Sequence, residues 1–192
     1  KLKQAGHHQI ANALAVTLAA KHMGLENNLI VQSLQAFDGV EGRYKVIKTI
    51  QGITFIEDSI ATRTISVKAA LEATPKPIIW IGGGVDKGAT FEELETLVKD
   101  KVSLFLGIGQ DGEQFAKRLT GLTTTDFTTL KDGRSALEWA CITGLNHLKT
   151  HHQNQGTILL APLAASFDQF KDYKDRANIF RQVVEGLTVN HG

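Results

Sequence analysis

This sequence of 192 residues has one cysteine, three prolines and almost no net charge. The single Cys141 cannot form an internal disulfide, which agrees with a protein of the reducing cytoplasm. Together with Ala136, Leu137 and Ala140, Cys141 forms an apolar pattern with helical spacing. We therefore expect its side chain to be small and buried and not to act as a nucleophile. The sequence therefore gives no sign of a secreted, disulfide-stabilised scaffold.

Long apolar runs and charge excess are also missing. No run reaches the length of a membrane span, and no signal-peptide core follows the first residues. A net charge of +1 gives no long-range field that would attract nucleic acid or an anionic membrane. We expect a cytoplasmic protein that binds neither, and any anionic ligand must be held by local groups.

The composition is that of an ordinary folded protein, with 42% hydrophobic and 21% charged residues. The length fits one domain, or one domain with part of another. Helices are predicted at about 10–23, with Gly24 as its C-cap, and at 26–37. Two glycines within residues 38–42 then break the pattern, which places a domain boundary and hinge there, between segments 1–40 and 41–192.

The second segment predicts a Rossmann-like α/β fold, a mostly parallel sheet flanked by helices. Strands 43–50 and 53–57 form a hairpin through Gln51-Gly52, and strands alternate with helices from there on. Helices are expected at 64–73, 91–98, 112–119, 134–148 and 175–187, and strands at 77–81, 102–106, 123–127 and 156–160.

Ligand-binding groups of such a sheet gather at the carboxyl ends of its strands. Four strand-to-helix junctions qualify here, at residues 58–62, 82–88, 107–112 and 159–176. The last is the most informative, because an apolar strand is followed by a serine and then by alternating aromatic and charged residues.

Two of the junctions are rich in glycine. Residues 107–112 spell G-x-G-x-x-G, which is either a dinucleotide-binding fingerprint or a tight structural turn. The turn is favoured, because the unit is internal and the following strand is weak. Residues 82–84 are three glycines, which allow the backbone to approach a ligand closely. Lys87 is the only cation of the loop 82–88, and it is either a ligand contact or a solvated surface lysine.

The remaining candidates have structural alternatives. Asp58, Ser59 or Thr62 could simply cap the helix that follows. Arg43 and Tyr44 could be edge residues of the first strand. His151 and His152 are expected in a polar loop after the helix, and without histidines at ligand spacing on one helix we predict no metal bound by this chain alone.

Taken together, these motifs resemble the carboxyl-terminal part of the Mur ligases, and among them the members that add glutamate to UDP-N-acetylmuramoyl-L-alanine in peptidoglycan synthesis. The resemblance covers nearly the whole chain, with the first forty residues matching the helical end of the central ATP-binding domain. It is carried in order by Gly6 to Ala15, Gly42 to Tyr44, Asp58 to Thr62, Gly83 to Gly88 and Ser166 to Phe170.

The resemblance implies ATP-dependent amide synthesis through an acyl phosphate, with ATP and Mg²⁺ as cofactors of the full-length enzyme. Groups around glutamate would be Thr62, Lys87, Ser166, Phe167 and Tyr173, and groups at ATP would be Gln9, Asn12, Arg43 and Asp58. An acidic amino acid needs a cation and hydroxyl donors, which this set supplies. The family pattern D-S-K-A-T-N is altered, because Ile60 and Arg63 replace the Lys and the Asn.

No G-x-x-x-x-G-K-[ST] phosphate loop occurs in the 192 residues. The family also needs a modified lysine and magnesium ligands from its central domain. We therefore expect a part of a longer enzyme that is inactive and binds no cofactor alone, and whose partners are the missing amino-terminal and central domains. The rival hypotheses are a stand-alone dinucleotide-binding module and a non-catalytic interaction domain.

Overall fold

The computed structural model describes residues 7–37, 39–40 and 42–187. The chain divides into two compact units, Lys1–Val40 and Glu41–Gly192.

The first unit is a pair of helices, α1 (His7–His22) and α2 (Asn27–Ala36). Gly24 ends α1 with φ +79°, and the Leu25 N–H donates to Ala20 O at 3.1 Å, as expected for a glycine cap. Among the described side chains of this unit only Ile30 is buried, whereas Leu18 and Met23 are more than 70% exposed. Two helices alone do not cover these apolar groups, so this unit lacks a hydrophobic core of its own.

The second unit contains a six-stranded sheet in the order β1-β2-β6-β3-β4-β5. Only β1 (Lys45–Ile50) is antiparallel to its neighbour, which is β2 (Ile53–Glu57). The parallel strands are completed by β3 (Ile78–Gly83), β4 (Val102–Ile108), β5 (Thr124–Phe127) and β6 (Gly156–Leu160). The predicted mostly parallel α/β fold is confirmed.

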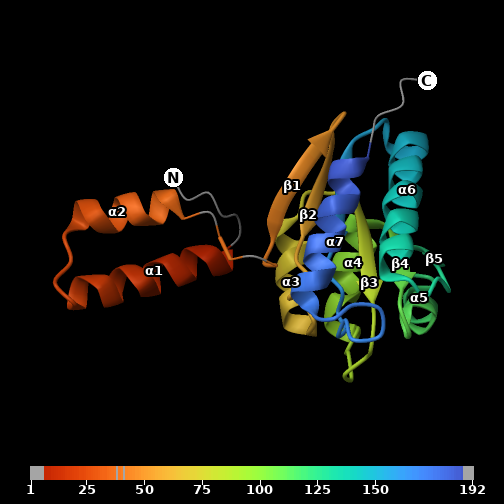
Figure 1. The fold of residues 1–192 in the computed structure, drawn as a ribbon, viewed down its shortest axis with the longest axis horizontal. Helices are drawn as coiled ribbons and strands as arrows, with labels where there is room; N and C mark the ends of the chain where they lie inside the picture. Colours follow the sequence, from red (N-terminus) through yellow and green to blue (C-terminus); the bar gives the residue numbers. More distant parts are fainter. Residues whose placement is uncertain (1–6, 38, 41, 188–192) are drawn as a thin grey trace. The chain divides into compact units, whose positions relative to one another are not determined.

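Helices cover both faces of this sheet (Figure 1). One core lies under α3 (Thr64–Ala73), the 3₁₀ turn η1 (Glu92–Leu94), α4 (Glu95–Lys101) and α5 (Gly112–Leu119). The other lies under α6 (Gly133–His152) and α7 (Tyr173–Gly186). Successive strand residues point to opposite faces, so Trp80 is in the first core and Ile79 and Ile81 in the second. Cys141 is buried in the second core, as expected, and burial raises the pKa of its thiol.

The predicted hairpin between β1 and β2 is confirmed. Gln51 and Gly52 both have positive φ, +48° and +90°, the backbone of a two-residue turn that matches the twist of the strands. The expected start of β1 at Arg43 is wrong by two residues, because Tyr44 has φ +40° and cannot continue an extended strand.

The prediction of a polar loop at His151 and His152 is also wrong. Helix α6 runs on to His152 and ends where Gln153 takes the left-handed conformation and its N–H donates to Leu148 O. No glycine or proline occurs from Leu145 to Gln153, and basic side chains are favourable in the last turn of a helix. The extension puts His147 and His151 on one helix, four residues apart, contrary to the expected lack of such spacing.

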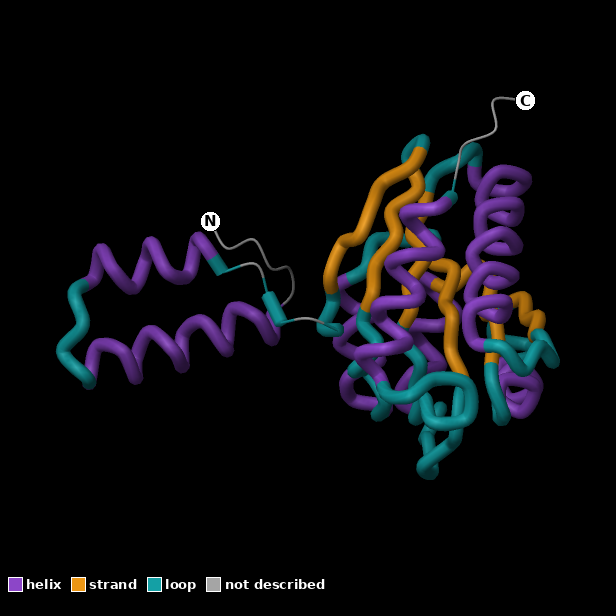
Figure 2. Tube along the Cα trace, viewed as in Figure 1, coloured by secondary structure: helices purple, strands orange, loops and turns teal. Residues whose placement is uncertain are grey.

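The connections after β2, β3, β4 and β6 emerge together at one edge of the sheet (Figure 2). Strand β6 lies between β2 and β3 although it comes last in the chain. The chain therefore leaves β2 toward α3 on one face and β6 toward α7 on the other. This reversal is the type of position at which open α/β sheets bind ligands.

Candidate functional site

The segments after β3 and β6 run side by side at this carboxyl edge. Val85 and Ala165 exchange two backbone hydrogen bonds of 2.9 and 3.0 Å, and Gly83 N–H donates to Pro162 O at 2.7 Å. Gly83 and Gly84 have φ of +122° and +129°. A Cβ at Gly83 would lie 2.0 Å from Ile108 O, and one at Gly84 would lie 2.1 Å from Ala165 O. These two glycines therefore admit protein backbone, where the sequence suggested the close approach of a ligand.

This contact brings Lys87 and Phe167 together. The Lys87 ammonium lies 5.8 Å from the centroid of the Phe167 ring, a cation-π distance. Lys87 is exposed, Phe167 is 69% exposed, and the neighbouring Ser166 is buried. An exposed ring and an exposed ammonium beside a buried hydroxyl-bearing residue form a surface that can bind a carboxylate and the aliphatic chain attached to it.

The segment after β2 is tied to the same edge. Asp58 N–H donates to Leu160 O at 2.8 Å, and Leu163 N–H donates to Ala61 O at 2.9 Å. Thr62, half-buried, follows directly. At the start of α3, the Thr64 hydroxyl is 3.0 Å from Thr90 O in the segment after β3. The loops that carry Thr62, Lys87 and Ser166 are thus joined by hydrogen bonds.

Helix capping does not explain the segment 58–62. The N-cap of α3 is Arg63, whose side chain makes no capping hydrogen bond. The Ser59 hydroxyl accepts a bond from Arg176 instead, and Asp58 lies outside the helix. The capping alternative is therefore wrong.

Asp58 is a buried carboxyl group beside a second carboxylate, that of Glu57. Burial, with a smaller contribution from Glu57, raises the pKa of Asp58 to about 7. The Tyr44 backbone N–H and the Arg43 guanidinium act in the opposite direction. Arg43 and Asp58, both predicted at ATP, are thus close enough to interact electrostatically.

The other predicted residues have separate environments. Tyr173 begins α7, and its ring atoms Cδ2 and Cε2 lie 3.4 Å from where a Cβ of Gly42 would be. Asn12 is exposed on α1, and Gln9 is in α1 although its side chain lies outside the described residues. Both belong to the other compact unit.

Arg176 is the residue that the sequence reasoning left without a role. It is 1% exposed, and its guanidinium donates to the Ser59 hydroxyl at 2.8 Å, to Ser59 O at 2.9 Å and to Ala164 O at 3.3 Å. Burial lowers its pKa to about 10, against the opposing effect of Asp168 and Glu57, so it stays charged at neutral pH. It holds the β2 and β6 segments together.

The sequence does carry a signal for this role. Arg176 shares the buried face of α7 with Ala177, Phe180, Val183 and Val184. A cation at a core position of an amphipathic helix needs buried partners.

Residues 107–112 form a tight turn. A Cβ at Gly107 would lie 2.3 Å from Gly112 O. The Gln110 N–H donates to Asp168 Oδ2 at 2.7 Å, and the Asp111 N–H donates to Gly84 O at 2.9 Å. In a dinucleotide fingerprint such N–H groups point toward the pyrophosphate, whereas here they donate to oxygen atoms of the protein. This favours the structural turn.

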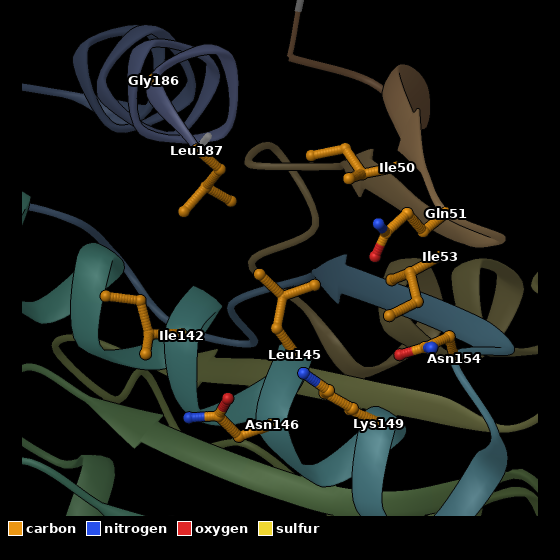
Figure 3. Close-up of a pocket in the computed structure, with 10 residues that line it drawn as sticks. All are labelled: Ile50, Gln51, Ile53, Ile142, Leu145, Asn146, Lys149, Asn154, Gly186 and Leu187. Atoms are coloured by element: carbon orange, nitrogen blue, oxygen red, sulfur yellow. The ribbon is translucent and has the colours of Figure 1, made fainter. Parts of the chain in front are cut away.

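A cleft of about 440 Å³ lies at the amino edge of the sheet (Figure 3). Its walls include the apolar side chains of Ile53, Leu145 and Leu187 and the polar ones of Lys149 and Asn154. None of the predicted site residues lines it.

The described residues contain neither a metal-binding cluster nor a membrane-spanning helix. No three His, Cys, Asp or Glu side chains there are arranged to hold a metal ion. No described helix has the length and apolar character needed to cross a membrane.

No family model matches the chain. Similar curated proteins are UDP-N-acetylmuramoylalanine--D-glutamate ligases. The one from Thermus thermophilus is 45% identical over 163 residues, which are 85% of this chain and 38% of that protein. The one from Deinococcus radiodurans is 38% identical over 185 residues, 92% of this chain and 39% of that protein. The chain thus spans less than half the length of these relatives.

Solved structures with the same fold include a pseudomurein peptide ligase type C from Methanothermus fervidus, with a TM-score of 0.65 and 20% identity over 98% of this chain and 37% of that one. A folylpolyglutamate synthase from Mycobacterium tuberculosis gives a TM-score of 0.66 at 14% identity, covering 97% of this chain and 42% of that one. UDP-N-acetylmuramate-alanine ligase from Thermotoga maritima gives 0.60 at 18% identity, covering 96% of this chain and 39% of that one.

Proposed function

We propose that this chain, whose predicted resemblance to a segment of the Mur ligases the relatives confirm, is the glutamate-binding part of an ATP-dependent ligase in the cytoplasm. The reaction joins glutamate to UDP-N-acetylmuramoyl-L-alanine in peptidoglycan synthesis. The observation that carries the proposal is the pairing of Lys87 with Phe167 beside Ser166, at the carboxyl edge of β3 and β6.

The proposed reaction has two steps. The substrate carboxylate first attacks the γ-phosphorus of ATP, which releases ADP and leaves an acyl phosphate. The amine of glutamate then attacks the acyl carbon, the carbon-oxygen bond to phosphate breaks, and the amine loses a proton as the amide forms. The role left to this chain is to hold glutamate so that its amine reaches the acyl carbon.

The Lys87 ammonium binds one glutamate carboxylate in this proposal. It is exposed, and no ion pair to it is found among the described residues, so it can engage a ligand without breaking a salt bridge. Ser166 and Thr62 add hydroxyl donors, while Phe167 and Tyr173 give apolar walls for the glutamate methylenes. Arg63, exposed at the start of α3, offers the positive charge that Ile60 does not.

Arg43 and Asp58 supply the part of the ATP site that lies in this unit. A guanidinium suits phosphate oxygens, and a carboxyl group with a pKa of about 7 can accept hydrogen bonds from ribose hydroxyls or donate one. Gln9 and Asn12 of the other unit are assigned to adenine.

The residues present do not fit Mg²⁺ or the triphosphate by themselves. The sequence has no phosphate loop, and the described residues have no cluster of three metal-ligating side chains. In this proposal, the phosphate loop and the magnesium ligands come from parts of the full-length protein that correspond to the unmatched regions of the relatives. The first unit, with apolar side chains exposed and no core, is suited to be the end of such a further domain. The hinge predicted at residues 38–42 includes residues 38 and 41, which lie outside the described residues.

Kinetics of the full-length enzyme test the glutamate site. Lys87→Ala should raise the KM for glutamate about 10- to 150-fold, the effect of losing a charge-assisted hydrogen bond of about 1.5–3 kcal/mol, with little change in the KM for ATP. The matched control is Lys99→Ala, another exposed lysine, on α4 and in an i,i+4 pair with Glu95. It should behave like wild type.

Equal effects of Lys87→Ala on both KM values would refute the assigned role. A second measurement uses the chain as it is. Amide resonances of Lys87, Ser166 and Phe167 should shift with millimolar glutamate and not with glutamine. If neither glutamate nor ATP causes shifts while the full-length protein binds another protein, the chain is an interaction domain.

A further inference from the structure

The described residues include a histidine cluster at the amino edge of the sheet, away from the proposed glutamate site. Ser103 is the second residue of β4, and its hydroxyl oxygen lies 2.7 Å from His147 Nε2 and 2.7 Å from His152 Nε2. Both histidines are in the last turns of α6. The ring of His151 is also close, with its centroid 4.6 Å from that of His147.

Two imidazole nitrogens thus converge on one small polar group. Because both lie 2.7 Å from the same oxygen, they are at most about 5.4 Å apart. A serine hydroxyl has one proton, so it donates to one imidazole and accepts from the other when both rings are neutral. Nitrogens bound to one Zn²⁺ at about 2.0–2.1 Å are separated by about 3–3.5 Å, which lies within this upper bound.

We propose that His147, His152 and Ser103 form a binding site for a divalent transition metal ion of the Zn²⁺ class. The two Nε2 atoms supply the principal bonds, and the Ser103 oxygen and water complete the coordination. Neutral imidazole is a preferred ligand of zinc, copper and nickel, whereas calcium and magnesium prefer oxygen. Since no three His, Cys, Asp or Glu side chains converge in the described residues, the affinity expected is micromolar, short of that of a structural zinc site.

The surroundings permit a cation. Ser103 and His152 line a surface depression of about 360 Å³, which gives the ion a path from solvent. Two lysines also line it, but both have partners. Lys76 is 2.7 Å from Asp100, and the Lys101 ammonium donates to Leu71 O and Glu72 O at 2.6 and 2.9 Å.

Zinc titration of the tag-free chain, followed by NMR of the histidine ring nitrogens, tests the site. The resonances of His147 and His152 should shift together and saturate at micromolar Zn²⁺. His152→Gln should weaken binding about tenfold or more, and Ser103→Ala by a smaller factor. His22→Gln is the matched control, because His22 is an exposed histidine near the end of another helix, and it should bind zinc like wild type.

A different ligand pair would overturn the proposal. His147 and His151 are four residues apart on α6, a spacing that can also chelate a metal. If His151→Gln abolishes binding while His152→Gln does not, the site is that pair and the role of Ser103 is refuted. An absence of shifts in wild type at millimolar Zn²⁺ refutes any site here. Because the wild-type titration alone identifies the histidines that respond, this result stands even where a variant folds poorly.

Discussion

Arg176 provides the sharpest test of how this fold holds the segments at the carboxyl edge of its sheet together. Arg176→Ala removes the donor of four hydrogen bonds to Ser59 and Ala164 and leaves those oxygens without that partner. It also removes the positive charge that interacts with the buried Glu57 and the half-buried Asp168. Breaking a buried, hydrogen-bonded charge cluster by deleting one partner costs about 3–5 kcal/mol.

That cost is a large share of the stability of a typical domain, about 5–15 kcal/mol. With a urea m-value of about 2 kcal/mol/M, the unfolding midpoint should fall by about 1.5–2.5 M. Tryptophan fluorescence is the suitable assay, because Trp80 and Trp139 both lie in the second unit and report its unfolding alone.

Two further variants make the test specific. Arg176→Lys keeps the charge, but an ammonium group cannot bridge Ser59 and Ala164 as the planar guanidinium does. Its loss of unfolding free energy should therefore lie between zero and that of Arg176→Ala. Lys174→Ala, on an exposed position of the same helix, should change stability by about 0.5 kcal/mol or less. A loss below about 1 kcal/mol for Arg176→Ala would refute the idea that this guanidinium ties the β2 and β6 segments together.

Two more predictions concern the same edge. Gly84→Ala should destabilise the second unit by more than about 3 kcal/mol, because its Cβ would lie 2.1 Å from Ala165 O, whereas Gly88→Ala, with open space around it, should cost only about 1 kcal/mol of backbone strain. Urea midpoints of the two variants compare them, and equal losses would contradict the steric argument. Asp58 should make wild type lose stability as pH rises from about 4 to 7, because the folded state binds its proton more tightly than the unfolded state, with a pKa of about 7 against 3.8. Asp58→Asn should flatten that pH dependence of the urea midpoint, and parallel profiles would show that Asp58 does not titrate there.

Much of the architecture follows from local patterns. The strands 53–57 and 156–160 and the helices 64–73 and 112–119 have their predicted bounds, because periodicity and glycine punctuation act within a few residues. The end of α6 was missed, since no glycine or proline stops the helix at Leu148 and the cap is a left-handed Gln153. A residue type other than glycine rarely adopts that conformation, so no local pattern predicts this helix end.

The sequence by itself determined the fold class and the resemblance to the Mur ligases, because motifs are short and ordered along the chain. Only the tertiary structure decided which loops meet. The position of β6 between β2 and β3 brings Phe167 to Lys87 and Arg176 to Ser59, residues that are 80 and 117 positions apart. The tertiary structure also showed that Gly83 and Gly84 make close contacts with protein backbone. The space around a glycine depends on chain segments that no local pattern specifies.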